Sequence, residues 1–110
     1  MTARHTRSGA ERVALRGRLH GQAPAIRVGR EGLTAAVVGA IEEALAAREA
    51  IKVRFEKGSP VDAREGGPRL AELLGAELLG RIGRLAMLYR PRPREDDSGG
   101  AAGGSELQQE

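Results

Sequence analysis

A strand pattern, a turn with two glycines and a helix pattern follow one another directly in residues 24–48. An apolar-alternating run at 25–28 leads into the turn at 29–32, Gly-Arg-Glu-Gly, and a helical pattern follows from Leu33. Glycine at both ends of the turn allows positive φ and lets a ligand approach the backbone, because no Cβ blocks it. The first turn of the next helix has unpaired N–H groups and a partial positive charge, which suits a phosphate oxygen. Residues 29–32, which we call the glycine loop, are therefore a candidate anion site, with an ordinary αβ turn as the alternative.

Helix and strand patterns alternate along the rest of the chain. We predict helices at 9–20, 35–48 and 60–74, and strands at 24–28, 51–56, 77–82 and 85–89. Ser8 and Thr34 are the expected N-caps of the first two helices. Ser59 is the expected N-cap of the third, with Pro60 at its first helical position and Gly75 as its C-cap.

The third predicted helix contains Gly66-Gly67-Pro68 in its middle. Gly67 precedes a proline and is therefore pushed away from helical angles. We expect a short first piece, an interruption, and a second piece at 69–74.

The predicted order α-β-α-β-α-β-β indicates an α/β fold (α+β, two-layer) with a four-stranded mixed sheet. The βαβ units favour parallel strands, whereas the last two strands form an antiparallel hairpin around Gly83-Arg84. One Tyr and one Phe are the only aromatic residues, so the core consists mainly of Leu, Val, Ile and Ala, with Phe55 assigned to it. This scarcity argues against recognition of bases by aromatic stacking.

We expect three parts in the chain: a flexible basic arm at 1–8, a folded domain at 9–92 and a disordered acidic, Gly-rich tail at 93–110. All 18 basic residues lie in 1–94 together with 10 of the 15 acidic ones, so this part carries +8 and the remainder −5. A basic body with an acidic appendage indicates a polyanionic partner. Charge that serves only solubility is the alternative.

Several classes of function are disfavoured by what the sequence lacks. It has no cysteine, and its two histidines do not form a zinc site. The glycine loop lacks the Lys-Ser/Thr ending of a P-loop and the third glycine of a dinucleotide fingerprint. No apolar run reaches the roughly 20 residues of a membrane span, and no signal core follows the N-terminus. We therefore expect a cytoplasmic protein that is not an enzyme and has no metal, cofactor, small-molecule substrate or membrane partner.

Four stretches, in this order, resemble the CRM domain (chloroplast RNA splicing and ribosome maturation), and more closely its stand-alone bacterial YhbY-type members. They are 26–34 (IRVGREGLT), 49–54 (EAIKVR), 74–84 (LGAELLGRIGR) and 88–91 (LYRP). The resemblance implies an RNA-binding fold related to the C-terminal domain of bacterial translation initiation factor three, with a KH-like GxxG loop that clamps the nucleic-acid backbone. The glycine at 66 and 67 and the proline at 68 depart from the family's continuous helix, and Glu31 places a carboxylate inside the presumed phosphate loop.

The first hypothesis is an RNA-binding protein of ribosome biogenesis, because bacterial relatives are associated with precursors of the large ribosomal subunit. Its partner would be ribosomal RNA, bound by a monomer. The candidate RNA-binding residues are Gly29, Arg30, Glu31 and Gly32 in the loop and Arg12, Arg16, Arg27, Arg81, Arg84 and Arg90 elsewhere. The alternative is a protein-interaction module, or a general RNA-binding or chaperone protein not tied to the ribosome. The acidic tail would then be a protein contact or an arm that shields the basic face.

Overall fold

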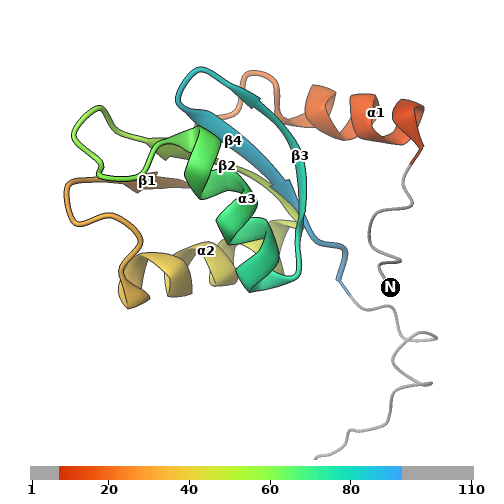
Figure 1. Cartoon of the computed structure of the whole chain (residues 1–110). Coiled ribbons are helices and arrows are strands. Elements are labelled where there is room, and N and C mark those ends of the chain that lie inside the picture. The colour runs from red at the N-terminus through yellow and green to blue at the C-terminus, as the bar shows by residue number, and fades with distance from the viewer. Residues whose placement is uncertain (1–7, 93–110) are drawn as a thin grey trace, which may run out of the picture.

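The computed structural model describes residues 8–92, so the predicted tail and, apart from Ser8, the predicted basic arm lie outside the described residues. Residues 8–92 form three helices and four strands in the predicted order α-β-α-β-α-β-β (Figure 1). They are α1 (Gly9–Leu19), β1 (Ile26–Val28), α2 (Ala35–Arg48), β2 (Ala50–Phe55), α3 (Ala63–Leu74), β3 (Glu77–Ile82) and β4 (Leu85–Tyr89). None of the helices in residues 8–92 is long and apolar enough to cross a membrane.

The four strands form one mixed sheet in the order β1-β2-β4-β3. β1 and β2 run parallel, with Ile26 beside Val53 and Val28 beside Phe55, because α2 carries the chain back as a crossover. β4 lies between β2 and β3 and is antiparallel to both. The hairpin of β3 and β4 turns at Gly83, where φ is 58°. The predicted mixed sheet is thus confirmed.

The two faces of the sheet are covered unequally. α2 and α3 pack on one face over the larger core cluster, which includes Ile41, Leu70 and Phe55. α1 packs on the opposite face, where Leu15 and Leu19 contact a smaller cluster formed by Ala50, Leu79 and Met87, with Tyr89 against it. α1 reaches β2, β3 and β4 but leaves the polar side chains nearer β1 uncovered. One face is therefore a closed core, and the other is only half covered.

Helix α3 differs from the sequence prediction in two ways. It runs without interruption from Ala63 to Leu74, although Pro68 lies inside it. Its N-cap is Asp62 rather than Ser59, because the Asp62 carboxylate accepts a hydrogen bond from the Glu65 N–H at 2.9 Å. Ser59 instead makes a local turn, in which its hydroxyl donates to the Val61 carbonyl at 2.6 Å.

The glycines of α3 explain why the helix stays continuous. Gly66 and Gly67 are buried and face the sheet, whereas Pro68 faces solvent. A Cβ at Gly67 would lie 3.2 Å from Leu78 and 3.3 Å from Ala86. Tertiary packing of the bare glycine face against the sheet therefore outweighs the local preference of Gly-Gly-Pro for a break.

The expected caps of the other helices are present. Ser8 caps α1 in a reciprocal capping box with Glu11, and the Thr34 hydroxyl accepts the Val37 N–H at 3.1 Å at the start of α2. Gly75 ends α3 in the left-handed conformation, with φ 63° and ψ 36°.

A β-bulge on β3 ties α1 to the sheet. Leu78 lies opposite Leu88 and Gly80 lies opposite Met87, so Leu79 is an extra residue between them. The side chain of Leu79 is buried under α1. Its carbonyl accepts hydrogen bonds from the guanidinium groups of Arg12 at 3.2 Å and Arg16 at 2.9 Å.

Candidate nucleic-acid interface

The glycine loop is a tight turn between β1 and α2. The Gly32 N–H donates to the Gly29 carbonyl at 3.0 Å. Gly32 has a φ of 73° and is buried, and a Cβ there would lie 3.0 Å from Pro60. Gly29 has no positive φ, and a Cβ there would meet nothing within 4 Å. Gly32 is therefore required by the fold, whereas the open space beside Gly29 leaves room for a ligand.

The helix that follows the glycine loop presents an uncompensated N-terminus. Thr34 caps it, and Ala35 and Ala36 in its first turn are exposed. Among the three helices, α2 alone has no acidic residue in its first turn, whereas α1 carries Glu11 there and α3 carries Glu65. The positive end of the α2 dipole is therefore not offset by a side chain in that turn and favours an anion.

Three loops meet at the end of the sheet where the glycine loop lies, on the left and top of Figure 1. We call them the loop cluster: the glycine loop, residues 57–60 after β2, and the hairpin turn at 83–84. The Arg30 side chain lies against Gly58, 3.7 Å from where a Cβ would stand. The hairpin turn joins through a hydrogen bond from the Phe55 N–H to the Arg84 carbonyl, at 2.8 Å. The first two loops are neighbours because the carboxyl ends of adjacent parallel strands lie at one edge.

Three cations of the loop cluster are available to a ligand. Arg30, Lys57 and Arg84 are all exposed. Within residues 8–92, none of the three forms an ion pair or a side-chain hydrogen bond. Glu31 is exposed beside them, and it too forms no ion pair in the described part of the chain. The cluster is thus a basic surface with one carboxylate in it.

Two further arginines lie next to the cluster and share one carboxylate. Arg27 on β1 contacts Glu56 at 3.2 Å, and Arg54 on β2 contacts it at 3.5 Å. Hydrogen bonds and charge from Arg27, and then from Arg54, hold the pKa of Glu56 below its ordinary value. Glu56 therefore remains ionised at neutral pH and partly neutralises both arginines.

Three of the predicted contact residues are engaged within the fold and do not reach the loop cluster. Arg12 forms an ion pair with the buried Glu77 and donates to the Leu78 carbonyl at 3.1 Å. Arg16 binds the carbonyl of the bulge residue Leu79. Arg90 binds Glu42 at 2.8 Å and the Leu74 carbonyl at 2.8 Å. The structure thus gives these three arginines internal partners, while Arg81 stands exposed on β3 near the hairpin turn.

Lys57 and Arg54 were not among the site residues predicted from the sequence. A signal for both was present in the chain. Arg54 lies on the polar side of an alternating strand, and Lys57 follows the end of that strand. Because β1 and β2 are joined by one helix and run parallel, the loop after β2 had to lie beside the glycine loop.

The described residues contain no candidate metal centre. No group of three or more His, Cys, Asp or Glu side chains within residues 8–92 is arranged to hold a metal ion. Apart from the Glu31 carboxylate, the charged groups of the loop cluster are guanidinium and ammonium groups, which are donors suited to phosphate oxygens.

Comparison with known proteins agrees with this chemistry. The model of the CRS1 / YhbY (CRM) domain family matches residues 8–90. A solved structure, that of the hypothetical protein SAV1595 from Staphylococcus aureus, aligns with a TM-score of 0.60 and 26% sequence identity. The alignment covers 80% of this chain and 92% of that protein, which is described as a candidate RNA-binding protein. No curated protein matches the sequence significantly.

Proposed function

Because the chain belongs to the CRS1/YhbY (CRM) domain family, we propose that it is an RNA-binding protein whose loop cluster contacts the RNA backbone. The description of the Staphylococcus aureus neighbour supports RNA as the partner. The observation that carries the proposal is the set of exposed, unpaired cations Arg30, Lys57 and Arg84 on neighbouring loops at one end of the sheet, the same end as the glycine loop that leads into α2.

The physical argument rests on the charge and spacing of phosphates. Each phosphate carries a negative charge that a guanidinium group or helix N-terminus neutralises, and counterions are released in the process. The glycine loop lets the backbone approach closely at Gly29, where the space is open. Glu31 weakens this attraction, although salt screens it over a Debye length of about 8 Å. The surrounding cations outnumber it, so the net effect favours RNA.

We further propose that the RNA is ribosomal and belongs to a precursor of the large subunit, and that the protein acts in ribosome assembly without catalysing a reaction. The role in ribosome assembly is supported by the resemblance of the chain to stand-alone bacterial members of the family. Within residues 8–92, the loop cluster holds no histidine and no pair of carboxylates that general acid–base catalysis would use.

The binding proposal is tested by charge reversal with a matched control. Arg30→Glu and Arg84→Glu remove cations of the loop cluster, whereas Arg69→Glu makes the same change on an exposed arginine in the second half of α3. Affinity for single-stranded RNA is measured by fluorescence anisotropy over a range of salt. We expect the first two variants to bind more weakly and to lower the log–log salt slope by about 0.7 for each phosphate that the variant no longer neutralises. A salt-independent affinity, or an equal loss of affinity in Arg69→Glu, would refute phosphate binding by the cluster.

The ribosomal part is tested separately by sedimentation of a cell lysate at low magnesium. We expect the wild-type protein to sediment with large-subunit precursors and Arg30→Glu to shift toward the top of the gradient. Wild-type protein that stays at the top throughout would contradict the ribosomal assignment but not RNA binding. It would then leave the general RNA-binding or protein-interaction alternatives.

A further inference from the structure

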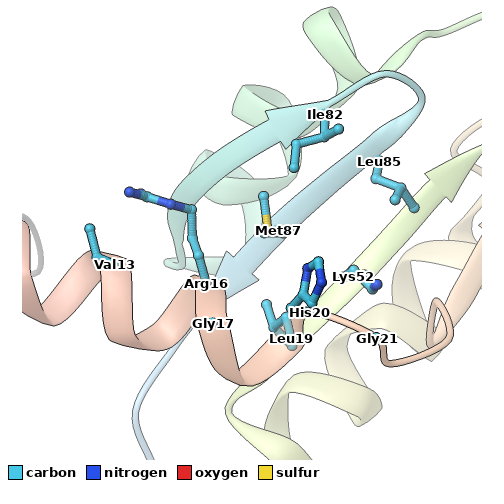
Figure 2. Close-up of a pocket in the computed structure, with 10 residues that line it drawn as sticks. All are labelled: Val13, Arg16, Gly17, Leu19, His20, Gly21, Lys52, Ile82, Leu85 and Met87. Atoms are coloured by element: carbon cyan, nitrogen blue, oxygen red, sulfur yellow. The ribbon is translucent and has the colours of Figure 1, made fainter.

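A groove of about 500 Å³ lies between α1 and the β3–β4 hairpin, on the half-covered face of the sheet (Figure 2). Its floor consists of Leu19, Met87 and Leu85. Its walls include Val13 on α1 and Ile82 on β3, which are two of the most exposed large apolar side chains, at 58% and 68%. Such a volume falls within the roughly 300–1,000 Å³ of small-molecule sites.

The groove stays open because of a missing side chain. Gly17 lines it from α1, and a Cβ there would meet nothing within 4 Å. Glycine is less favourable than alanine in the interior of a helix. Its presence at this position leaves a gap in the α1 surface that faces the hairpin.

The rim of the groove is cationic. The cations Arg16 and Lys52 line it together with the His20 ring, and none of its described lining residues is acidic. Arg16 is held in place by its hydrogen bond to the Leu79 carbonyl. Figure 2 shows the His20 ring at the end of α1, beside the floor of the groove. An apolar floor below fixed cations complements a ligand that has a flat apolar body and a negative flank.

The groove is continuous with the loop cluster. Ile82 and Leu85 line the groove and flank the hairpin turn that carries Arg84. On the same face of β2, Lys52 at the groove is followed by Arg54, which lies opposite Leu85. The mouth of the groove is therefore within reach of an RNA strand whose phosphates contact the loop cluster.

We propose that this groove accepts one unstacked nucleobase of single-stranded RNA, an inference that rests on the RNA binding proposed above. The base lies on the aliphatic floor, and the imidazole of His20 offers a flat surface for stacking. The phosphates on either side of the base contact Lys52 and Arg16. Aliphatic side chains and one histidine thus serve where other RNA-binding folds use Phe or Tyr.

The principal competitor for the groove is an apolar side chain of a partner protein. RNA is favoured by the cationic rim without a carboxylate and by the continuity with the basic loop cluster. A protein partner would not require a basic surface on the same face of β2. RNA oligomers that have the same phosphates but differ in whether they carry a base distinguish between these two occupants of the groove.

The test compares two oligomers that carry the same phosphates. One is an RNA backbone with abasic sites at every position, and the other has a single 2-aminopurine at its centre. We expect the wild-type protein to bind the oligomer with the base about tenfold more tightly, in line with what the stacking of one base on a protein side chain contributes. The emission of 2-aminopurine should change on binding.

The matched variants are Gly17→Leu, which fills the groove, and Gly17→Ala, which makes the same backbone change with little added volume. We expect Gly17→Leu to lose the preference for the base while it still binds the abasic oligomer, and Gly17→Ala to retain it. Ile82→Ser, which removes an exposed wall, should weaken the preference, whereas Leu73→Ser on α3, at 60% exposure, should not.

Any other result would contradict the binding of a base in the groove. Equal affinity of the wild type for both oligomers would overturn the proposal, leave phosphate binding intact and make a protein side chain the remaining candidate for the groove. A preference that survives in Gly17→Leu would place the base elsewhere. No binding of either oligomer would refute the proposed RNA binding and the groove together.

Discussion

The ring of Phe55 lies against the backbone of Gly66, so close that a Cβ on the glycine would stand 2.4 Å from the ring. Phe55 is the only phenylalanine of the chain and is 1% exposed. α3 can approach β2 this closely only because its inner face lacks a side chain at this point. The loss in helix propensity at the glycine is thus offset by the burial of the largest side chain in the core.

We predict that Gly66→Ala destabilises the protein by about 1–3 kcal/mol, because the methyl group forces the ring or the helix to move. Gly39→Ala is the control, since Gly39 is exposed on α2 and a Cβ there would meet nothing within 4 Å. It should stabilise the protein by up to about 1 kcal/mol through helix propensity. Urea unfolding measures both values, and a shift of the same sign in the two variants would contradict the packing account.

The two glycines of the glycine loop should respond differently to substitution. Gly32→Ala places a side chain at a φ of 73° and brings it 3.0 Å from Pro60, so we expect a loss of about 1–2 kcal/mol. Gly29→Ala should fold with unchanged stability because its surroundings are open. Thermal unfolding tests this, since each 1 kcal/mol shifts the Tm of a domain of this size by about 4–8 °C. Equal Tm shifts in the two variants would contradict the geometry of the turn.

Arg12 should contribute to stability rather than to RNA affinity. The Glu77 side chain is 4% exposed and forms an ion pair with Arg12, whose own side chain is 32% exposed. We expect Arg12→Ala to lower the free energy of unfolding by about 2–3 kcal/mol, at or below the range for a fully buried pair. Arg30→Ala should leave stability within about 0.5 kcal/mol and weaken RNA binding. If Arg12→Ala instead weakened RNA binding and Arg30→Ala lowered stability, the two residues would have the opposite roles.

Glu56 should restrain RNA binding, because it occupies the charges of Arg27 and Arg54. We predict that Glu56→Gln increases affinity several-fold at low salt and that the gain shrinks as salt screens the charges. Glu43→Gln removes the same charge from an exposed site on α2 with no ion pair in the described structure, and it should have a smaller effect. If both variants bind alike, net charge alone accounts for the change.

The ion pair of Glu42 and Arg90 predicts a dependence of stability on pH. The hydrogen bond from Arg90 holds the pKa of Glu42 below its ordinary value of 4.5. A lowered pKa in the folded state means that the pair stabilises the fold above about pH 4.5 and ceases to do so as the pH falls through the lowered pKa. The Tm difference between wild type and Glu42→Gln should therefore be largest near neutral pH and shrink in acid. A difference that grows in acid would contradict this assignment.

Much of the fold follows from local patterns in the sequence. The hairpin strands, the Thr34 cap and the Gly75 end of α3 are as predicted, because each rests on chemistry within a few residues. The continuity of α3 was not predictable in this way. It depends on the contact of Gly66 with Phe55, which lies on a different element, and no local propensity contains that information.

The candidate site was predictable only in part. Of the arginines predicted as RNA contacts, Arg30 and Arg84 are exposed in the loop cluster, whereas Arg12, Arg16 and Arg90 have partners within the fold. A sequence shows the charge of an arginine but not whether a carboxylate or a bare carbonyl lies within its reach. The β-bulge at Leu79 supplies such a carbonyl, and no signal in the sequence announces it.

That bulge also affects how the molecule behaves beside its own copies. β3 is an outer strand of the sheet, and an outer strand with a free, regular edge invites another chain to add to it and aggregate. Here the guanidinium groups of Arg12 and Arg16 bind two carbonyls of that strand, and the extra residue disturbs the spacing of its backbone groups. The opposite outer strand, β1, is only three residues long. Within residues 8–92, neither outer strand of the sheet therefore offers a long, regular edge to a second copy of the chain.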